Sequence, residues 1–289
     1  MSGRPTCRTS AVAWLSVCDF ALFPCPVLVA GGEFVPDDAT LFLAHYNTCV
    51  DADFSKGARV PDPLDTVYFT RKGGHFGGGL VCRVGAEALR ESDAERASVS
   101  LMPVRAFDGV RYAATDNLDL VQGTFECWVK PYFSVPRAKD MPADWPMQYF
   151  LLHYSESLSR HLMVLINSNS RTTNAFFFVV TTETGTATLA RALDWQPGTW
   201  HHVAVTWDTT TAPGNLGLFL DGRKAGSASL APLQGKFLKT PGGSFAVGSM
   251  MERRGGNPFQ FYKADAVLDE IRISNTVRYQ DDFAPPGQE

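Results

Sequence analysis

The sequence lacks most features that mark a nucleic-acid-binding or catalytic chain. Its 26 Lys and Arg and 30 Asp and Glu give a formal net charge of −4 at pH 7, and no long block of either sign occurs. Proteins that bind nucleic acid need a basic patch for the phosphates, so we predict no nucleic-acid partner. The chain also has no HExxH, GxSxG or phosphate-loop motif, which leaves zinc hydrolases, α/β-hydrolases and P-loop enzymes without motif support.

Cysteine is scarce beyond the N-terminal region. Three of the six cysteines lie within the first 25 residues, and Cys49, Cys82 and Cys127 follow without a CxxC spacing. An odd number of separated cysteines allows one disulfide at most and offers no zinc ligand set. Cys82 and Cys127 stand within strand-like runs, so we expect them to pack as small apolar side chains.

Residues 1–32 differ in composition from the rest of the chain. Two arginines precede the apolar run AVAWLSVCDFALFPCPVLVA, and the small residues AGG end the segment. This order of charged, apolar and small residues is typical of a secretory signal peptide, with a wrongly assigned start or a disordered apolar leader as the alternatives. Asp19 and two prolines interrupt the run, so we predict no membrane span. The sequence therefore indicates a secreted or cell-surface protein whose residues 33–289 form one domain.

Short apolar runs separated by turn residues dominate the chain beyond Gly32. Runs such as GTFECWVKP, HHVAVTWD and NLGLFLDG are rich in β-branched and aromatic residues. AFFFVV and TLFLA are apolar on both faces, which is typical of central strands covered on both sides. Asp221-Gly222 tolerates the positive φ angles of a two-residue hairpin turn. We predict an all-β antiparallel sandwich of two packed sheets, with a single helix candidate at Gly85–Ser98.

Five segments resemble, in order, the landmark segments of laminin G-like (LamG-like) domains in the concanavalin A-like lectin/glucanase superfamily. They are DATLFLAHYNTCVDADFSKG, DNLDLVQGTFECWVKP, WQPGTWHHVAVTWD, LGLFLDGRKAG and AVLDEIRISNTVRY, and they extend from about Ala39 to Tyr279. The resemblance implies a jelly-roll sandwich of two curved antiparallel sheets with the first and last strands as neighbours. Such domains mainly bind carbohydrate or protein.

The last segment carries two adjacent carboxylates inside an apolar strand. Laminarinase-type relatives instead use an E-x-D-x-x-E spacing, which places alternate carboxylates in one cleft. Adjacent residues of a regular strand face opposite ways, so Asp269 and Glu270 do not match a glycosidase pair, and we assign no catalytic residue. Glu270 shares a face with Arg272, which predicts an ion pair. Asp269 falls on the apolar face, where a charge needs a compensating partner.

Two hypotheses account for Asp269. In the first, its carboxylate caps a neighbouring backbone loop. In the second, it binds Ca²⁺ together with Asn47, Asp51 and Asp53, which offer hard oxygen ligands near the other end of the domain. The resemblance favours calcium, because many relatives bind this ion, although Asn47 stands where an Asp is often found. The candidate metal ligands are therefore Asn47, Asp51, Asp53 and Asp269.

Two aromatic residues in polar loops are candidates for contact with a sugar. Trp145 lies in the segment KDMPADWPMQY, and Tyr262 lies in MMERRGGNPFQFYKAD. Sugar rings stack on aromatic side chains through their C–H faces. Trp128, Trp200 and Trp207 lie within strand-like runs, so we expect them in the core.

The sequence leaves three functions open. The first is a non-catalytic binding module for carbohydrate or a surface glycoconjugate, which the missing catalytic motifs and the laminin G-like resemblance favour. The second is a carbohydrate-active hydrolase or lyase with a dispersed catalytic set on the same scaffold. The third is a structural domain of a surface protein without a glycan ligand. A deep cleft of converging carboxylates would favour the enzyme, and a shallow face with aromatic residues would favour binding.

Overall fold

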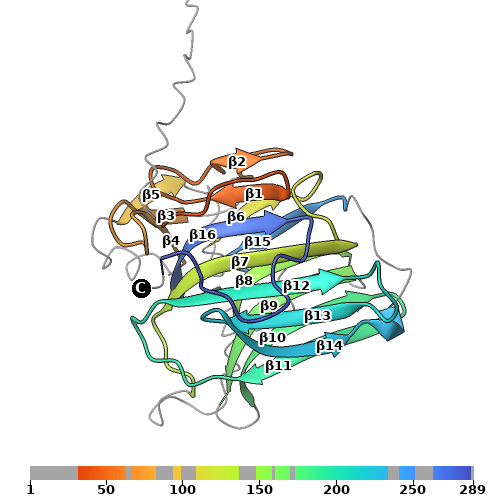
Figure 1. Cartoon of the computed structure of the whole chain (residues 1–289). Coiled ribbons are helices and arrows are strands. Elements are labelled where there is room, and N and C mark those ends of the chain that lie inside the picture. The colour runs from red at the N-terminus through yellow and green to blue at the C-terminus, as the bar shows by residue number, and fades with distance from the viewer. Residues whose placement is uncertain are drawn as a thin grey trace, which may run out of the picture.

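Two antiparallel sheets make up the described part of this computed structural model (Figure 1). The described residues are 32–62, 67–82, 94–98, 109–136, 148–157, 160–169, 173–233, 241–250 and 263–287. One sheet has ten strands and the other has six. Within these ranges, no helix is long and apolar enough to span a bilayer.

The strands of each sheet come from distant parts of the chain. The ten-stranded sheet contains β1 (Thr40–Ala44), β2 (Phe54–Ser55), β3 (Val67–Thr70), β4 (Gly79–Val81), β5 (Ala94–Ser98), β7 (Gln122–Pro131), β12 (His201–Asp208), β13 (Asn215–Leu220), β14 (Arg223–Ser229) and β16 (Ala266–Ser274). Its order is β14-β13-β12-β7-β16-β4-β3-β5, and β1 pairs with both β16 and β2. The six-stranded sheet contains β6 (Val110–Ala113), β8 (Gln148–Ser157), β9 (Arg160–Asn169), β10 (Thr173–Thr182), β11 (Gly185–Ala192) and β15 (Ser244–Val247). Its order is β11-β10-β9-β8-β15-β6.

Successive side chains of a strand point to opposite faces of its sheet, and those that point between the two sheets are mainly apolar. The main core includes Phe125, Cys127 and Val129 of β7, Val203 and Val205 of β12, Val164 and Ile166 of β9, and Phe176 and Phe178 of β10. Burial of each large apolar side chain contributes about 1.5–3 kcal/mol. Cys82 and Cys127 are both fully buried here, as expected. The predicted all-β sandwich of two packed sheets is confirmed.

Two local features were also predicted. Asp221 and Gly222 have φ angles of 50° and 73°, so the expected hairpin turn joins β13 to β14. The first and last strands, β1 and β16, pair with Phe42 opposite Ile273. Both findings fit the jelly-roll topology that the resemblance implied.

The predicted helix at Gly85–Ser98 is wrong in its described part. Ala94–Ser98 form strand β5, which pairs with β3 at the edge of the ten-stranded sheet. Helix propensity is a weak preference, and backbone hydrogen bonds to an adjacent strand override it. The rest of the candidate lies outside the described residues.

Two segments outside the strands cover the outer face of the ten-stranded sheet. We call residues 33–38 the N-terminal strap and residues 275–287 the C-terminal strap. Phe34 packs edge-on against His202 of β12, and Phe283 of the other strap packs against the same imidazole ring. In Figure 1 the dark-blue C-terminal strap crosses the face of β7 and β12. The straps therefore bury polar side chains that would otherwise face water.

Candidate functional site

A β-bulge removes the Asp269-Glu270 pair from the regular pleat of β16. Asp269 lies opposite Trp128 of β7, whereas Arg272 lies opposite Glu126, so β16 has one residue more than its partner here. Glu270 adopts a left-handed φ of 56° within the bulge. Because of the bulge, the side chains of Glu270 and Arg272 form hydrogen bonds with different residues. The predicted ion pair between them is therefore wrong.

Glu270 instead binds the N-terminal strap and the first strand region. Its Oε1 lies 2.6 Å from His45 Nδ1, and its Oε2 accepts a hydrogen bond from Phe34 N at 2.5 Å. Burial raises the pKa of Glu270. Burial alone would lower the pKa of His45, but the hydrogen bond and charge of Glu270, with Asp53 and Glu33 nearby, raise it to about 9. We conclude that His45 carries a proton at neutral pH and neutralises Glu270.

The His45 pair predicts a stability that falls with rising pH. The pKa of His45 is higher in the folded chain, at about 9, than its ordinary value of 6.5. Its contribution is therefore complete below pH 6.5 and is lost as the pH rises through about 9. We expect urea unfolding at pH 6, 7.5 and 9.5 to show this loss, and His45→Gln to flatten the profile across that window. Equal pH slopes for both proteins would contradict the assignment.

Asp269 caps a backbone loop, as the first hypothesis predicted. We call residues 71–78 the glycine loop. Asp269 Oδ2 accepts hydrogen bonds from His75 N at 2.7 Å and Phe76 N at 3.0 Å. Its Oδ1 accepts from Glu270 N at 2.8 Å, and the residue is 1% exposed. Burial and the adjacent Glu270 raise the pKa of Asp269, while the three backbone N–H groups oppose that shift.

Asn47 holds the same loop from the other side. Its Oδ1 accepts a hydrogen bond from Gly78 N at 2.6 Å, and its Nδ2 donates to Glu33 Oε1 at 3.0 Å. Asn47 and Asp269 therefore both bind the glycine loop. Their side-chain oxygens, which the calcium hypothesis assigns to the ion, accept hydrogen bonds from backbone N–H groups.

Of the two remaining predicted metal ligands, Asp53 follows the same pattern. Asp53 Oδ2 accepts a hydrogen bond from His45 N at 2.7 Å, and Asp51 is half-buried. Among the described residues, no group of three His, Cys, Asp or Glu is arranged to hold a metal ion. As placed here, the four residues do not fit one shared calcium site. Calcium binding by Asn47, Asp51, Asp53 and Asp269 stays a prediction of the sequence.

The two predicted sugar-contacting residues, Trp145 and Tyr262, lie outside the described residues. Of the tryptophans expected in the core, Trp128 and Trp207 are buried, at 3% and 2% exposure. Trp200, which directly precedes β12, is partly buried and packs against the buried cluster of Phe34, Leu43 and Trp128, so it lies at the margin of the core.

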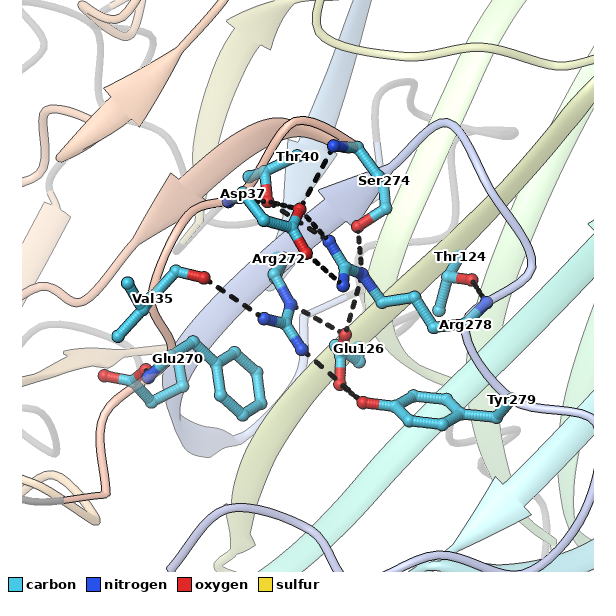
Figure 2. Close-up of polar contacts among 12 residues, drawn as sticks. Val35, Asp37, Thr40, Thr124, Glu126, Glu270, Arg272, Ser274, Arg278 and Tyr279 are labelled. Carbon is cyan, nitrogen blue, oxygen red and sulfur yellow. Dashed lines mark hydrogen bonds and ion pairs between the residues drawn. The ribbon is translucent and has the colours of Figure 1, made fainter.

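A charged cluster that the sequence did not reveal lies beneath the straps (Figure 2). Glu126 is fully buried, and its Oε1 accepts a hydrogen bond from Arg272 Nε at 2.8 Å. Its Oε2 accepts from the Tyr279 hydroxyl at 2.7 Å and lies 3.4 Å from His202 Nε2. Burial alone would raise the pKa of Glu126, but His202 and Arg272 lower it to about 2. In the sequence, the only indication of this cluster is Glu126, an acidic residue within the otherwise apolar run GTFECWVKP.

A second ion pair joins the two straps. Arg278 binds Asp37 with two parallel hydrogen bonds, Nη1 to Oδ2 at 2.8 Å and Nη2 to Oδ1 at 2.6 Å. Arg278 also donates from Nε to Ser274 Oγ and from its backbone N to Thr124 Oγ1. The Arg278 hydrogen bond lowers the pKa of Asp37 despite partial burial. These contacts hold both straps on the ten-stranded sheet.

The outer face of the six-stranded sheet presents a different surface. Backbone pairing aligns its side chains in three rows: Phe150-Leu165-Phe177, His153-Met163-Val179 and Ser155-His161-Thr181. Phe150, Leu165, His153, Ser155 and His161 are at most 8% exposed, and Phe150 and Leu165 pack against Met250. Met163, Phe177, Val179 and Thr181 are partly exposed. The part of this face that a ligand can reach therefore lies along β9 and β10, where apolar side chains are followed by the hydroxyl of Thr181.

Comparisons with known proteins match this architecture. The family model described as the concanavalin A-like lectin/glucanases superfamily matches residues 106–284. No curated protein matches the sequence. The binding domain of Paraclostridial Mosquitocidal Protein 1 is 11% identical with a TM-score of 0.55, covering 84% of this chain and 50% of that one.

Two further solved structures are similar at lower TM-scores. The SAP-like pentraxin from Limulus polyphemus is 12% identical with a TM-score of 0.41, covering 78% of this chain and 89% of that one. The Ruminococcus gnavus IT-sialidase CBM40 bound to α2,3-sialyllactose is 13% identical with a TM-score of 0.39, covering 59% and 88%. At identities this low, structural similarity shows only a shared fold. The function has to be argued from the residues of the site.

Proposed function

The chain belongs to the concanavalin A-like lectin/glucanases superfamily, and on that premise we propose that it is a non-catalytic binding module for carbohydrate. The observation that carries the proposal is the partly exposed group of side chains on β9 and β10 of the six-stranded sheet. Met163, Phe177 and Val179 are apolar and suit the C–H face of a sugar ring. Thr181, also partly exposed, supplies a hydroxyl that can hydrogen-bond to a sugar.

The burial of the acidic groups supports a non-catalytic role. Glu126, Asp269 and Glu270 are each at most 1% exposed, and each accepts hydrogen bonds from the protein itself. A general acid or nucleophile must reach the bond that it cleaves. Under the straps these three carboxyl groups have no such access, so they do not supply the converging cleft that a glycoside hydrolase needs.

We propose that this module acts outside the cell or on its surface. The support is the charged, apolar and small-residue order of residues 1–32. Expression with the native N-terminus in a secreting host, followed by N-terminal sequencing of the medium, tests this point. Retention of the intact chain inside the cells would remove export from the proposal.

Substitution of Phe177 tests the binding face. We expect a glycan array to identify ligands of the wild-type protein, and Phe177→Ala to weaken them about tenfold, because a stacked aromatic contact contributes on the order of 1 kcal/mol or more. Val60→Ala is the matched control, since Val60 is an exposed apolar residue, at 62%, outside both sheets. Unchanged melting temperatures would show that both variants fold. Wild-type affinity in Phe177→Ala would place the ligand elsewhere.

A further inference from the structure

A cationic and aromatic cluster lies at one end of the ten-stranded sheet, away from the six-stranded face. Lys130 is the penultimate residue of β7, and Trp200 directly precedes β12, the strand paired with β7. Lys130 Nζ lies 5.3 Å from the centre of the Trp200 ring and donates a hydrogen bond to Gly73 O at 3.2 Å. His75 of the glycine loop packs edge-on against Trp200 at 5.4 Å. Three separate segments therefore meet around one partly buried tryptophan.

The cluster has positive charge without a carboxylate partner. No Asp or Glu among the described residues forms an ion pair with Lys130 or with Lys72, which lies in the adjoining glycine loop. Both residues retain contact with water, since Lys130 is partly exposed and Lys72 is exposed. In a chain with a net charge of −4, this is a local site that attracts anions.

Two buried polar atoms beneath the cluster also lack partners. His75 stacks on Trp128 with ring centres 3.8 Å apart, and neither His75 Nε2 nor Trp128 Nε1 has a hydrogen-bond partner. Burial lowers the pKa of His75, which favours the neutral form of its ring. Unpartnered buried polar atoms are costly and are retained mainly where function or a bound group requires them. Trp128 is 3% exposed, so its indole supports the His75 ring and does not itself contact a ligand.

We propose that Trp200 and Lys130 bind an acidic sugar unit of a glycan. The indole of Trp200 stacks on the C–H face of the sugar ring, and the ammonium of Lys130 pairs with its carboxylate. The ligand class rests on the proposed carbohydrate-binding function, and the site is separate from the face that carries Phe177. An uncharged sugar of the same shape would use only the stacking contact, so the site selects for charge.

Two matched sugars test the proposal directly. Methyl β-glucuronide and methyl β-glucoside differ only in the carboxylate at C6, and NMR titration measures a Kd for each. We expect the wild-type protein to prefer the glucuronide about tenfold, and this preference to shrink at high salt. Lys130→Gln should abolish the preference while residual binding of both sugars remains. Trp200→Ala should weaken both sugars.

The controls separate this site from the rest of the molecule. Lys224→Gln changes a lysine on the distant edge strand β14 and should keep the tenfold preference. Val60→Ala, which changes an exposed residue outside both sheets, should also keep it, and Phe177→Ala on the glycan array reports separately on the six-stranded face. If Trp200→Ala does not fold by near-ultraviolet circular dichroism, Trp200→Phe replaces it, with a smaller expected loss. Equal wild-type affinity for the two sugars, or a preference that survives Lys130→Gln, would overturn the proposal.

Discussion

Replacing Glu126 with alanine should lower the free energy of unfolding by about 3–5 kcal/mol. Glu126 is fully buried and is the carboxylate that neutralises Arg272, which is itself only 7% exposed. Without it, the guanidinium stays buried without a counter-charge, and the Tyr279 hydroxyl loses its acceptor. For a domain of this size, the melting temperature should fall by roughly 10 °C.

Urea unfolding of a small set of variants measures this effect. Glu126→Gln should cost less than Glu126→Ala, because it removes the charge but keeps an oxygen for Tyr279. Combining Glu126→Leu with Arg272→Met should recover much of the loss, since an apolar pair needs no compensation. Arg223→Gln is the control, because the Arg223–Asp282 pair is exposed to water and should contribute little. A Glu126→Ala protein as stable as the Arg223→Gln control would show that the network does not hold the straps.

Replacing Asp269 with alanine should cost about 2–4 kcal/mol, because it leaves up to three buried N–H groups without an acceptor. Two of these donors, His75 N and Phe76 N, fix the glycine loop, and the third is the backbone N of Glu270. Removing one of two adjacent buried carboxyl groups relieves part of their repulsion, which keeps the expected loss below that of Glu126→Ala. Asp269→Asn retains an acceptor oxygen, so it should be milder.

The same variants separate the cap from the calcium hypothesis. A cap needs an acceptor, which Asn supplies, whereas a calcium site depends on the negative charge of Asp269. We therefore expect Asp269→Asn to unfold near the wild-type temperature, and EDTA to leave the wild-type melting curve unchanged. A lower melting temperature in EDTA that calcium restores, and that Asp269→Asn abolishes, would reinstate calcium as a ligand. Elemental analysis of the purified protein checks the metal content independently.

The two straps limit which surfaces of the fold a ligand can reach. The ten-stranded sheet is covered by both ends of the described chain, joined by Arg278 and Asp37. Both ends also meet at the glycine loop, because Gly32 and Gly287 each approach the Phe76 ring too closely for a Cβ atom. The binding proposals therefore use the partly exposed side chains of β9 and β10 on the six-stranded sheet and the partly exposed Trp200 at the end of the ten-stranded sheet.

The sequence by itself determined the sheet architecture and its turns. Short runs of β-branched and aromatic residues predicted the strands, and the continuous apolar run AFFFVV predicted a strand buried on both faces. Both predictions were possible because they depend only on residues that are adjacent in the sequence. The Asp221-Gly222 hairpin could be read in the same way, since its positive φ angles restrict which residues fit. The order of five familiar segments then indicated the superfamily, although local preference suggested a helix at Gly85–Ser98, whose described part, Ala94–Ser98, is strand β5.

Only the tertiary structure decided how the polar residues are used. Glu126 and Arg272 are 146 positions apart and meet because β7 and β16 are neighbours, which no local pattern encodes. The bulge in β16 adds one residue and so moves Glu270 away from the partner that regular alternation assigns to it. It lies against His45 instead. Side-chain direction depends on the register of each strand, and register is set by contacts between segments that are distant in sequence.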